Sequence, residues 1–151
     1  MDNKSITMVD DITLVTIQNV PFDIDFLAKM FEDIGKLSID VDMISLAPTQ
    51  SSLTSVSFTI DDNKLTNLLN YISTLKNKYE VKPIINSGNC KISVFDRAME
   101  KCPGFAAKIF KAAADKNAEI KLISTSEVEV SILIPFLNSQ EVFSSINNTL
   151  K

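Results

Sequence analysis

The chain has 151 residues, of which 45% are hydrophobic and 23% are charged, and its net charge is −4. This composition is typical of a globular protein, and the acidic balance argues against nucleic acid or an anionic membrane as a partner. No apolar run is long enough to span a bilayer and the start of the chain lacks a secretory pattern, so we expect a cytoplasmic protein.

The residue types that are missing limit the chemistry that this chain can perform. Histidine, the commonest general base and metal ligand, is absent, and Cys90 and Cys102 alone do not form a zinc-binding pattern. The three glycines are too far apart to form a phosphate-binding loop, and Arg97 is the single arginine. We therefore expect no catalytic residue, no metal and no cofactor.

The first half of the chain alternates between the periodicities of strands and helices. Apolar residues recur at helical spacing within 25–36 and again from Leu65 to Leu75, whereas β-branched residues dominate the expected strands. Those strands are 5–9, 12–17, 39–44, 53–60 and 81–85. From residue 12 onward the order is strand, helix, strand, strand, helix, strand, which is the ferredoxin-like pattern.

The second half repeats this order but lacks its last strand. Asn86 to Asn89 is interpreted as a linker between the halves. The elements expected after it are strands 91–95, 119–124 and 128–134 and helices 103–116 and 139–150. Since residues 5–9 have no role in the first half, we expect them to supply the missing strand. The predicted domains are 11–87 and 88–151, the second completed by strand 4–9, with the first domain inserted in it.

A direct sequence repeat supports this division. Ala28–Phe31 (Ala-Lys-Met-Phe) and Ile44-Ser45 recur 79 positions later as Ala107–Phe110 (Ala-Lys-Ile-Phe) and Ile123-Ser124. A repeat of fixed offset indicates two copies of one structural unit.

The second copy resembles the ACT domain. The resemblance lies in Cys102–Phe110 (Cys-Pro-Gly-Phe-Ala-Ala-Lys-Ile-Phe) and in Leu122–Val128 (Leu-Ile-Ser-Thr-Ser-Glu-Val). With Val41–Ile44 and Ser57–Ile60 in the first copy, the chain is similar to the tandem ACT regulatory region of aspartokinase. The resemblance implies an α+β fold of two ferredoxin-like ACT domains, each an antiparallel sheet with its helices on one face. It also implies no catalysis of the chain's own, binding of lysine or threonine, and action on an aspartokinase catalytic domain. Pairing of exposed sheet edges would bury more apolar area, so we also expect a homodimer.

An amino-acid ligand needs a partner for its carboxylate and another for its ammonium group. The Pro103-Gly104 loop leads into a helix whose positive end suits the carboxylate, and Asp40 and Asp42 suit the ammonium. Other acidic side chains are candidates for a basic ligand such as lysine. The predicted ligand-binding residues are Asp23, Asp25, Phe26, Asp40, Val41, Asp42, Pro103, Gly104, Phe105, Glu119 and Ile120. We expect the amino acid to bind at the interface between ACT units.

Two other classes of function stay open. Where the family has Pro-Gly in its first copy this chain has Ile24-Asp25, and Leu46 and Ser55 replace a glutamine and an aspartate. These changes favour an interaction or dimerisation module whose effector site has decayed. A ferredoxin-like enzyme such as an acylphosphatase needs an arginine in a phosphate-binding loop, and Arg97 offers little support for one.

Overall fold

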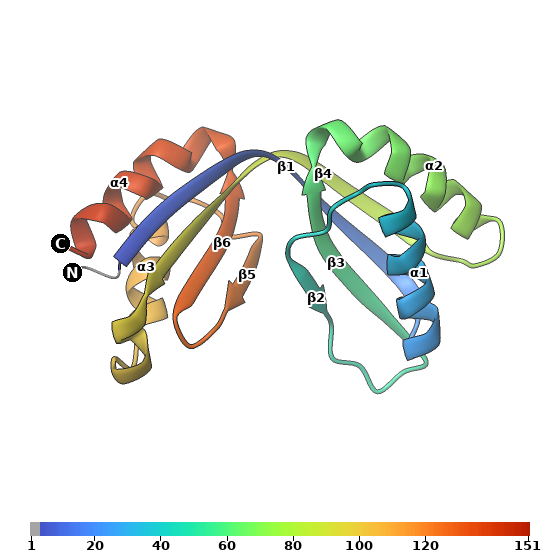
Figure 1. Ribbon diagram of the computed structural model, residues 1–151, viewed down its shortest axis with the longest axis horizontal. Coiled ribbons are helices and arrows are strands. Elements are labelled where there is room, and N and C mark those ends of the chain that lie inside the picture. The colour runs from blue at the N-terminus through green and yellow to red at the C-terminus, as the bar shows by residue number, and fades with distance from the viewer. Residues whose placement is uncertain (1–3) are drawn as a thin grey trace. The chain divides into compact units, whose positions relative to one another are not determined.

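The computed structural model describes residues 4–151, and Figure 1 shows their strands and helices. Six strands in this part of the chain form one hydrogen-bonded sheet in the order β2-β3-β1-β4-β6-β5. The chain divides into two compact units. Asp11–Ser87 form one, here called the inserted unit, and residues 4–10 with Gly88–Lys151 form the other, the discontinuous unit. Strands β1 (Lys4–Pro21) and β4 (Lys82–Asp96) each contribute residues to both units.

The inserted unit is an antiparallel sheet with two helices. Strand β3 pairs antiparallel with both β1 and β2. Its elements between the two long strands are α1 (Ile24–Lys36), β2 (Ile44–Leu46), β3 (Leu53–Asp61), the short 3-10 helix η1 (Asp62–Lys64) and α2 (Leu65–Lys76). Both helices contribute to one hydrophobic cluster with the strands, so they cover the same face of the sheet.

The period of each helix explains which residues enter that cluster. Met30 and Ile34 of α1 and Leu68 and Ile72 of α2 recur every four residues, and all four are at least 98% buried. Each such side chain contributes about 1.5–3 kcal/mol when it leaves water. Phe58 of β3 is fully buried between the helices and the sheet.

The discontinuous unit repeats the arrangement with different connections. Strand β6 pairs antiparallel with β4 and β5. Its elements after β4 are η2 (Arg97–Lys101), α3 (Phe105–Ala114), β5 (Leu122–Thr125), β6 (Glu129–Pro135), η3 (Phe136–Asn138) and α4 (Ser139–Thr149). Its core again joins both helices to one face of the strands, with Ile92, Ile109, Ile132 and Ile146 no more than 1% exposed.

The structure corrects the expected boundaries of the two long strands. Residues 5–9 and 12–17 belong to one strand of 18 residues, and Pro21 is its last residue. The register shifts between Ile17 and Val20, where Asn19 has φ +61°. The predicted linker 86–89 does contain the boundary between the two units, at Ser87 and Gly88, but it is not a loop, because these residues lie inside β4. Gly88 has φ +75°. Turn-forming residue types are tolerated here because sheet pairing outweighs their local preference.

Other expected elements are shorter than the sequence suggested. The strand 39–44 starts only at Ile44, although the preceding residues stay next to β3: the Met43 N–H donates to Thr59 Oγ1 (3.0 Å) and the Thr59 N–H donates to the Met43 carbonyl (3.0 Å). The strand 119–124 starts at Leu122. The helix 103–116 begins at Phe105, because Gly104 has φ +84°, outside the helical region. None of the helices described is long and apolar enough to cross a membrane.

Candidate functional site

The loop between β4 and α3 forms one wall of a cavity in the discontinuous unit. The chain leaves β4 at Asp96, makes the short helix η2 and enters α3 through Gly104. Gly104 is the N-cap residue of α3 and has no side chain to cap it. Its positive φ is a conformation that other residues adopt only at a cost, so glycine fits this entry to the helix. The Phe105 N–H donates to the Cys102 carbonyl at 3.3 Å, which closes the turn before the helix.

The connection between β5 and β6 forms the opposite wall. Ser126 Oγ accepts from the N–H groups of Val128 (3.3 Å) and Glu129 (3.1 Å), so this serine fixes the connection. Between the walls lies a cavity of about 480 Å³. Its lining residues are Met99, Glu100, Cys102, Gly104, Phe105, Ala106, Thr125, Ser126, Glu127 and Val130. The cavity therefore combines an apolar floor, hydroxyl groups, two carboxylates and the start of a helix.

The corresponding loop of the inserted unit is shorter and is capped by a side chain. Strand β1 ends at Pro21, and Asp23 Oδ1 accepts from the Asp25 N–H at 3.0 Å as the N-cap of α1. A cavity of about 430 Å³ lies between α1 and α2. It is lined by Asp23, Asp25, Phe26, Lys29, Met30, Asp33, Tyr71, Thr74, Leu75, Lys78 and Tyr79. The rings of Phe26 and Tyr79 meet edge to face with 4.8 Å between their centres.

One ion pair of the protein itself, Lys29–Asp33, lies along this second cavity. Lys29 Nζ donates to Asp33 Oδ1 at 2.7 Å, and the Tyr71 hydroxyl donates to Asp33 Oδ2 at 3.2 Å. The lysine bond lowers the pKa of Asp33, and the same bond raises the pKa of Lys29. Burial, followed by the charge of Asp33, raises the pKa of Tyr71. Both carboxylate oxygens of Asp33 therefore already accept hydrogen bonds from side chains of the protein itself.

The structure divides the predicted ligand-binding residues among three places. Asp23, Asp25 and Phe26 line the cavity of the inserted unit, and Gly104 and Phe105 line the cavity of the discontinuous unit. The remaining six do not line either cavity: Asp40, Val41, Asp42, Pro103, Glu119 and Ile120.

The six residues outside the cavities have other environments. Val41 and Ile120 pack against the two cores, whereas Asp40, Pro103 and Glu119 are exposed. The backbone N–H of Asp42 donates to the Thr59 carbonyl at 3.2 Å.

Several cavity residues were not among the predicted ligand-binding residues. Met99 and Glu100 belong to η2, a helix for which the sequence gave no periodic signal. Tyr71 lies in α2 whereas Tyr79 follows the end of that helix at Lys76, so no helical period in the sequence could have placed the two together.

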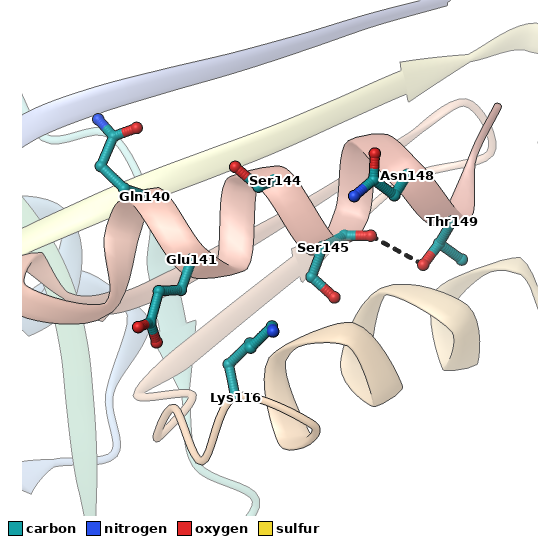
Figure 2. A pocket seen from close by; sticks show the side chains of 7 residues that line it. All are labelled: Lys116, Gln140, Glu141, Ser144, Ser145, Asn148 and Thr149. Atoms are coloured by element: carbon teal, nitrogen blue, oxygen red, sulfur yellow. Dashed lines mark hydrogen bonds between the residues drawn. The ribbon is translucent and has the colours of Figure 1, made fainter.

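A further groove runs along α4 and differs in character from both cavities. Figure 2 shows Lys116 reaching toward α4, while the polar side chains of α4 spread around the helix instead of converging. The Thr149 hydroxyl donates to the carbonyl of Ser145 in its own helix at 2.8 Å. None of the predicted ligand-binding residues lies here. Within residues 4–151 there is also no cluster of three acidic or cysteine side chains that could hold a metal ion.

Comparison with known proteins identifies relatives for both halves of the chain. The ACT domain family matches residues 92–150. The aspartokinase of Geobacillus stearothermophilus is 32% identical over 134 residues, which cover 87% of this chain and 31% of the relative. The chain thus spans about a third of the length of the curated relatives that it matches.

Solved structures share the fold over nearly the whole chain. The ligand-free regulatory subunit of aspartate kinase from Thermus thermophilus superimposes with a TM-score of 0.88 at 23% identity and covers 97% of both chains. Aspartokinase III of Escherichia coli, in complex with lysine and aspartate, gives a TM-score of 0.70 at 21% identity over 97% of this chain and 33% of that one. The two compact units account for all of residues 4–151, and these residues contain no kinase catalytic domain.

Proposed function

Because residues 92–150 match the ACT domain and most of the chain is homologous to aspartokinases, we propose that this protein is an aspartokinase-type regulatory module. In this proposal it is cytoplasmic, and both units are ferredoxin-like ACT domains, 11–87 and 88–151 completed by strand 4–9. Its ligand is an amino acid of the aspartate family, lysine or threonine. The strand and helix order of each unit and the likeness to regulatory-subunit structures support the assignment of the fold.

The observation that carries the proposal is the cavity at the entry to α3. A volume of about 480 Å³ lies within the range of small-molecule sites and accommodates one amino acid. The N-terminal end of α3 favours a carboxylate, since the helix dipole places partial positive charge there. Glu100 and Glu127 supply carboxylates for an ammonium group, and charge-assisted bonds of this kind are about twice as strong as neutral ones.

The same carboxylates favour lysine over threonine. Lysine carries two ammonium groups, and the cavity offers two acidic side chains, whereas threonine would leave one of them without a cationic partner. Aspartokinase III of Escherichia coli has been solved in complex with lysine, and its regulatory fold resembles that of this chain. We therefore propose lysine as the first effector to test.

A second candidate is an interaction module that binds no effector, and one observation in the inserted unit favours it. There Lys29 and Asp33 are paired with each other along the cavity, and Asp23 is used as a helix cap. An inserted unit that acts only as a dimerisation module would have these properties. It would join copies of the chain and contact a kinase catalytic domain without sensing an amino acid.

A thermal-shift screen of the twenty amino acids distinguishes the two functions. A ligand that binds only the native state must stabilise it, by about 2.7 kcal/mol at a concentration of 100 Kd. We expect lysine to raise the unfolding temperature, and Glu127→Gln to weaken this effect. Glu129→Gln is the matched control, because Glu129 lies two residues away, is exposed and does not line the cavity.

Sedimentation velocity with and without the ligand completes the test. If the amino acid in this cavity also contacts an ACT unit of a second copy of the chain, as we propose, it should change the distribution of monomer and homodimer. Absence of any thermal shift with all twenty amino acids, together with a stable dimer, would reject the sensing function in favour of the interaction module.

A further inference from the structure

Asp96 is a buried carboxylate at the end of β4 for which the proposed function has no role yet. Its side chain is 7% exposed, and the sequence gave no reason to select it. Asp96 Oδ1 accepts from the Ala98 N–H at 2.9 Å, so Asp96 is the cap of η2. Asp96 Oδ2 lies 3.8 Å from Lys4 Nζ. A buried carboxylate is costly unless it is paired, and these two groups are its partners.

The contacts of Asp96 reach both walls of the cavity at the entry to α3. Its side chain accepts from the Ala98 N–H at the start of η2, the helix that supplies Met99 and Glu100 to one wall. Its backbone N–H donates to the Val128 carbonyl at 2.8 Å, directly after Glu127 of the opposite wall. One residue therefore links the two walls and sets how far apart they lie.

Lys4 connects this link to two other elements of the same unit. It lies at the start of β1, and its Nζ also donates to the Leu150 carbonyl at 3.5 Å, directly after α4. A cation is favourable beside the last carbonyl groups of a helix. Lys4 therefore joins the first strand, the end of α4 and the buried carboxylate of Asp96.

We propose that Asp96, held by Lys4, is a positioning residue of the effector cavity: it fixes the η2–α3 loop at the distance from the β5–β6 connection at which an amino acid is bound. The importance of that cavity rests on the proposed function, but the positioning itself is a property of the apo protein. Asp96 does not touch the ligand in this scheme, since it does not line the cavity. The inserted unit has no equivalent, because its shorter loop is capped by Asp23.

Hydrogen exchange followed by mass spectrometry tests the positioning without a ligand. In Lys4→Met and Asp96→Asn we expect the amides of 97–105 and 126–129 to exchange about fivefold faster, the effect of losing one ion pair. Because the two residues act through each other, the double variant should exchange no faster than Asp96→Asn alone. Lys111→Met is the matched control: it removes an exposed ion pair with Asp115 (3.1 Å) in the same unit and should leave these amides unchanged.

Two outcomes of the exchange experiment would overturn the proposal. In the first, the amides of both walls exchange at the wild-type rate in Lys4→Met and in Asp96→Asn. In the second, the exchange rates rise uniformly through β4, β6 and α4, which would show only a loss of stability. If Asp96→Asn does not fold, Lys4→Met decides, since it leaves the bond to Ala98 in place.

Titration with lysine and with threonine separates this proposal from the proposed function. If the wild-type protein binds neither amino acid, the sensing function is rejected. The exchange rates alone then decide whether Asp96 positions the loop. Wild-type protein that binds one of them should do so about threefold or more tightly than Lys4→Met. Equal affinity in the two proteins would overturn the positioning while sensing stands.

Discussion

Replacing Gly104 by alanine tests the geometry of the loop on which the proposed site depends. Gly104 has φ +84°, and a Cβ atom added there would meet no atom within 4 Å. The cost is therefore one of backbone conformation, about 1–2 kcal/mol for an L-residue in the left-handed region. The smaller entropy of the unfolded alanine chain offsets about 0.4–1 kcal/mol of it. We expect Gly104→Ala to be destabilised by about 1 kcal/mol net.

Gly35 and asparagine provide the controls for this experiment. Gly35 lies in the last turn of α1, also with no atom within 4 Å of a new Cβ, so Gly35→Ala should stabilise the protein by about 0.5–1 kcal/mol. Gly104→Asn should cost less than Gly104→Ala, since asparagine enters the left-handed region more readily. Chemical denaturation monitored by circular dichroism measures all three free energies of unfolding.

The signs of these changes decide whether the reasoning holds. Gly104→Ala that is as stable as the wild type would show that φ at this position is not fixed by the fold. Gly104→Ala that loses stability while Gly35→Ala gains it would support the loop geometry. Lysine binding should then weaken in Gly104→Ala and stay unchanged in Gly35→Ala.

Three further predictions concern buried and paired groups. Ser93 and Ser131 share a buried hydrogen bond of 2.8 Å between their hydroxyl groups, so Ser131→Ala should cost about 1–3 kcal/mol in urea unfolding. The double Ser93→Ala/Ser131→Ala variant should recover most of that loss, and a double variant less stable than the single would contradict the pairing. Burial raises the pKa of the fully buried Cys90 thiol to about 12, so iodoacetamide at pH 8 should label the partly exposed Cys102 and spare Cys90 in the folded protein, as peptide mass spectrometry can show. The pKa of Asp33 is lowered in the folded state, so its stabilising contribution is present above the ordinary value of 3.8 and disappears as the pH falls through the lower folded pKa. Asp33→Asn should therefore flatten the acid side of the stability curve, and an unchanged curve would refute the pairing.

The helices and their buried faces could be predicted from the sequence, because their period is a local property. Met30 and Phe105 are 1% and 7% exposed, and Phe26, Phe31 and Phe110 pack against the cores while partly exposed. An amphipathic pattern of this length predicts a helix well, because burial of the apolar face stabilises the helix in the folded protein.

The long strands and the details of the site could not be predicted in the same way. Residues 86–89 carry the types that form turns, yet the structure places them inside β4. The cap that Asp96 forms with the Ala98 N–H is local, but its other partners, Lys4 and Val128, lie 92 and 32 positions away and could not be predicted from a local pattern. The family motif pointed to Gly104, whereas Glu100 joined the same cavity only through the unexpected helix η2.

The passage of β1 and β4 through both compact units has a consequence for synthesis on the ribosome. Residues 11–87 are continuous, so the inserted unit is complete once that stretch has left the exit tunnel. Residues 4–10 leave the exit tunnel before the inserted unit, yet they belong with residues 88–151, which follow it. Residues 4–10 of β1 must therefore wait for their partners while a whole unit folds behind them. The polar and charged residues among them, Lys4, Ser5, Thr7 and Asp10, reduce their tendency to pair with other nascent chains during that wait.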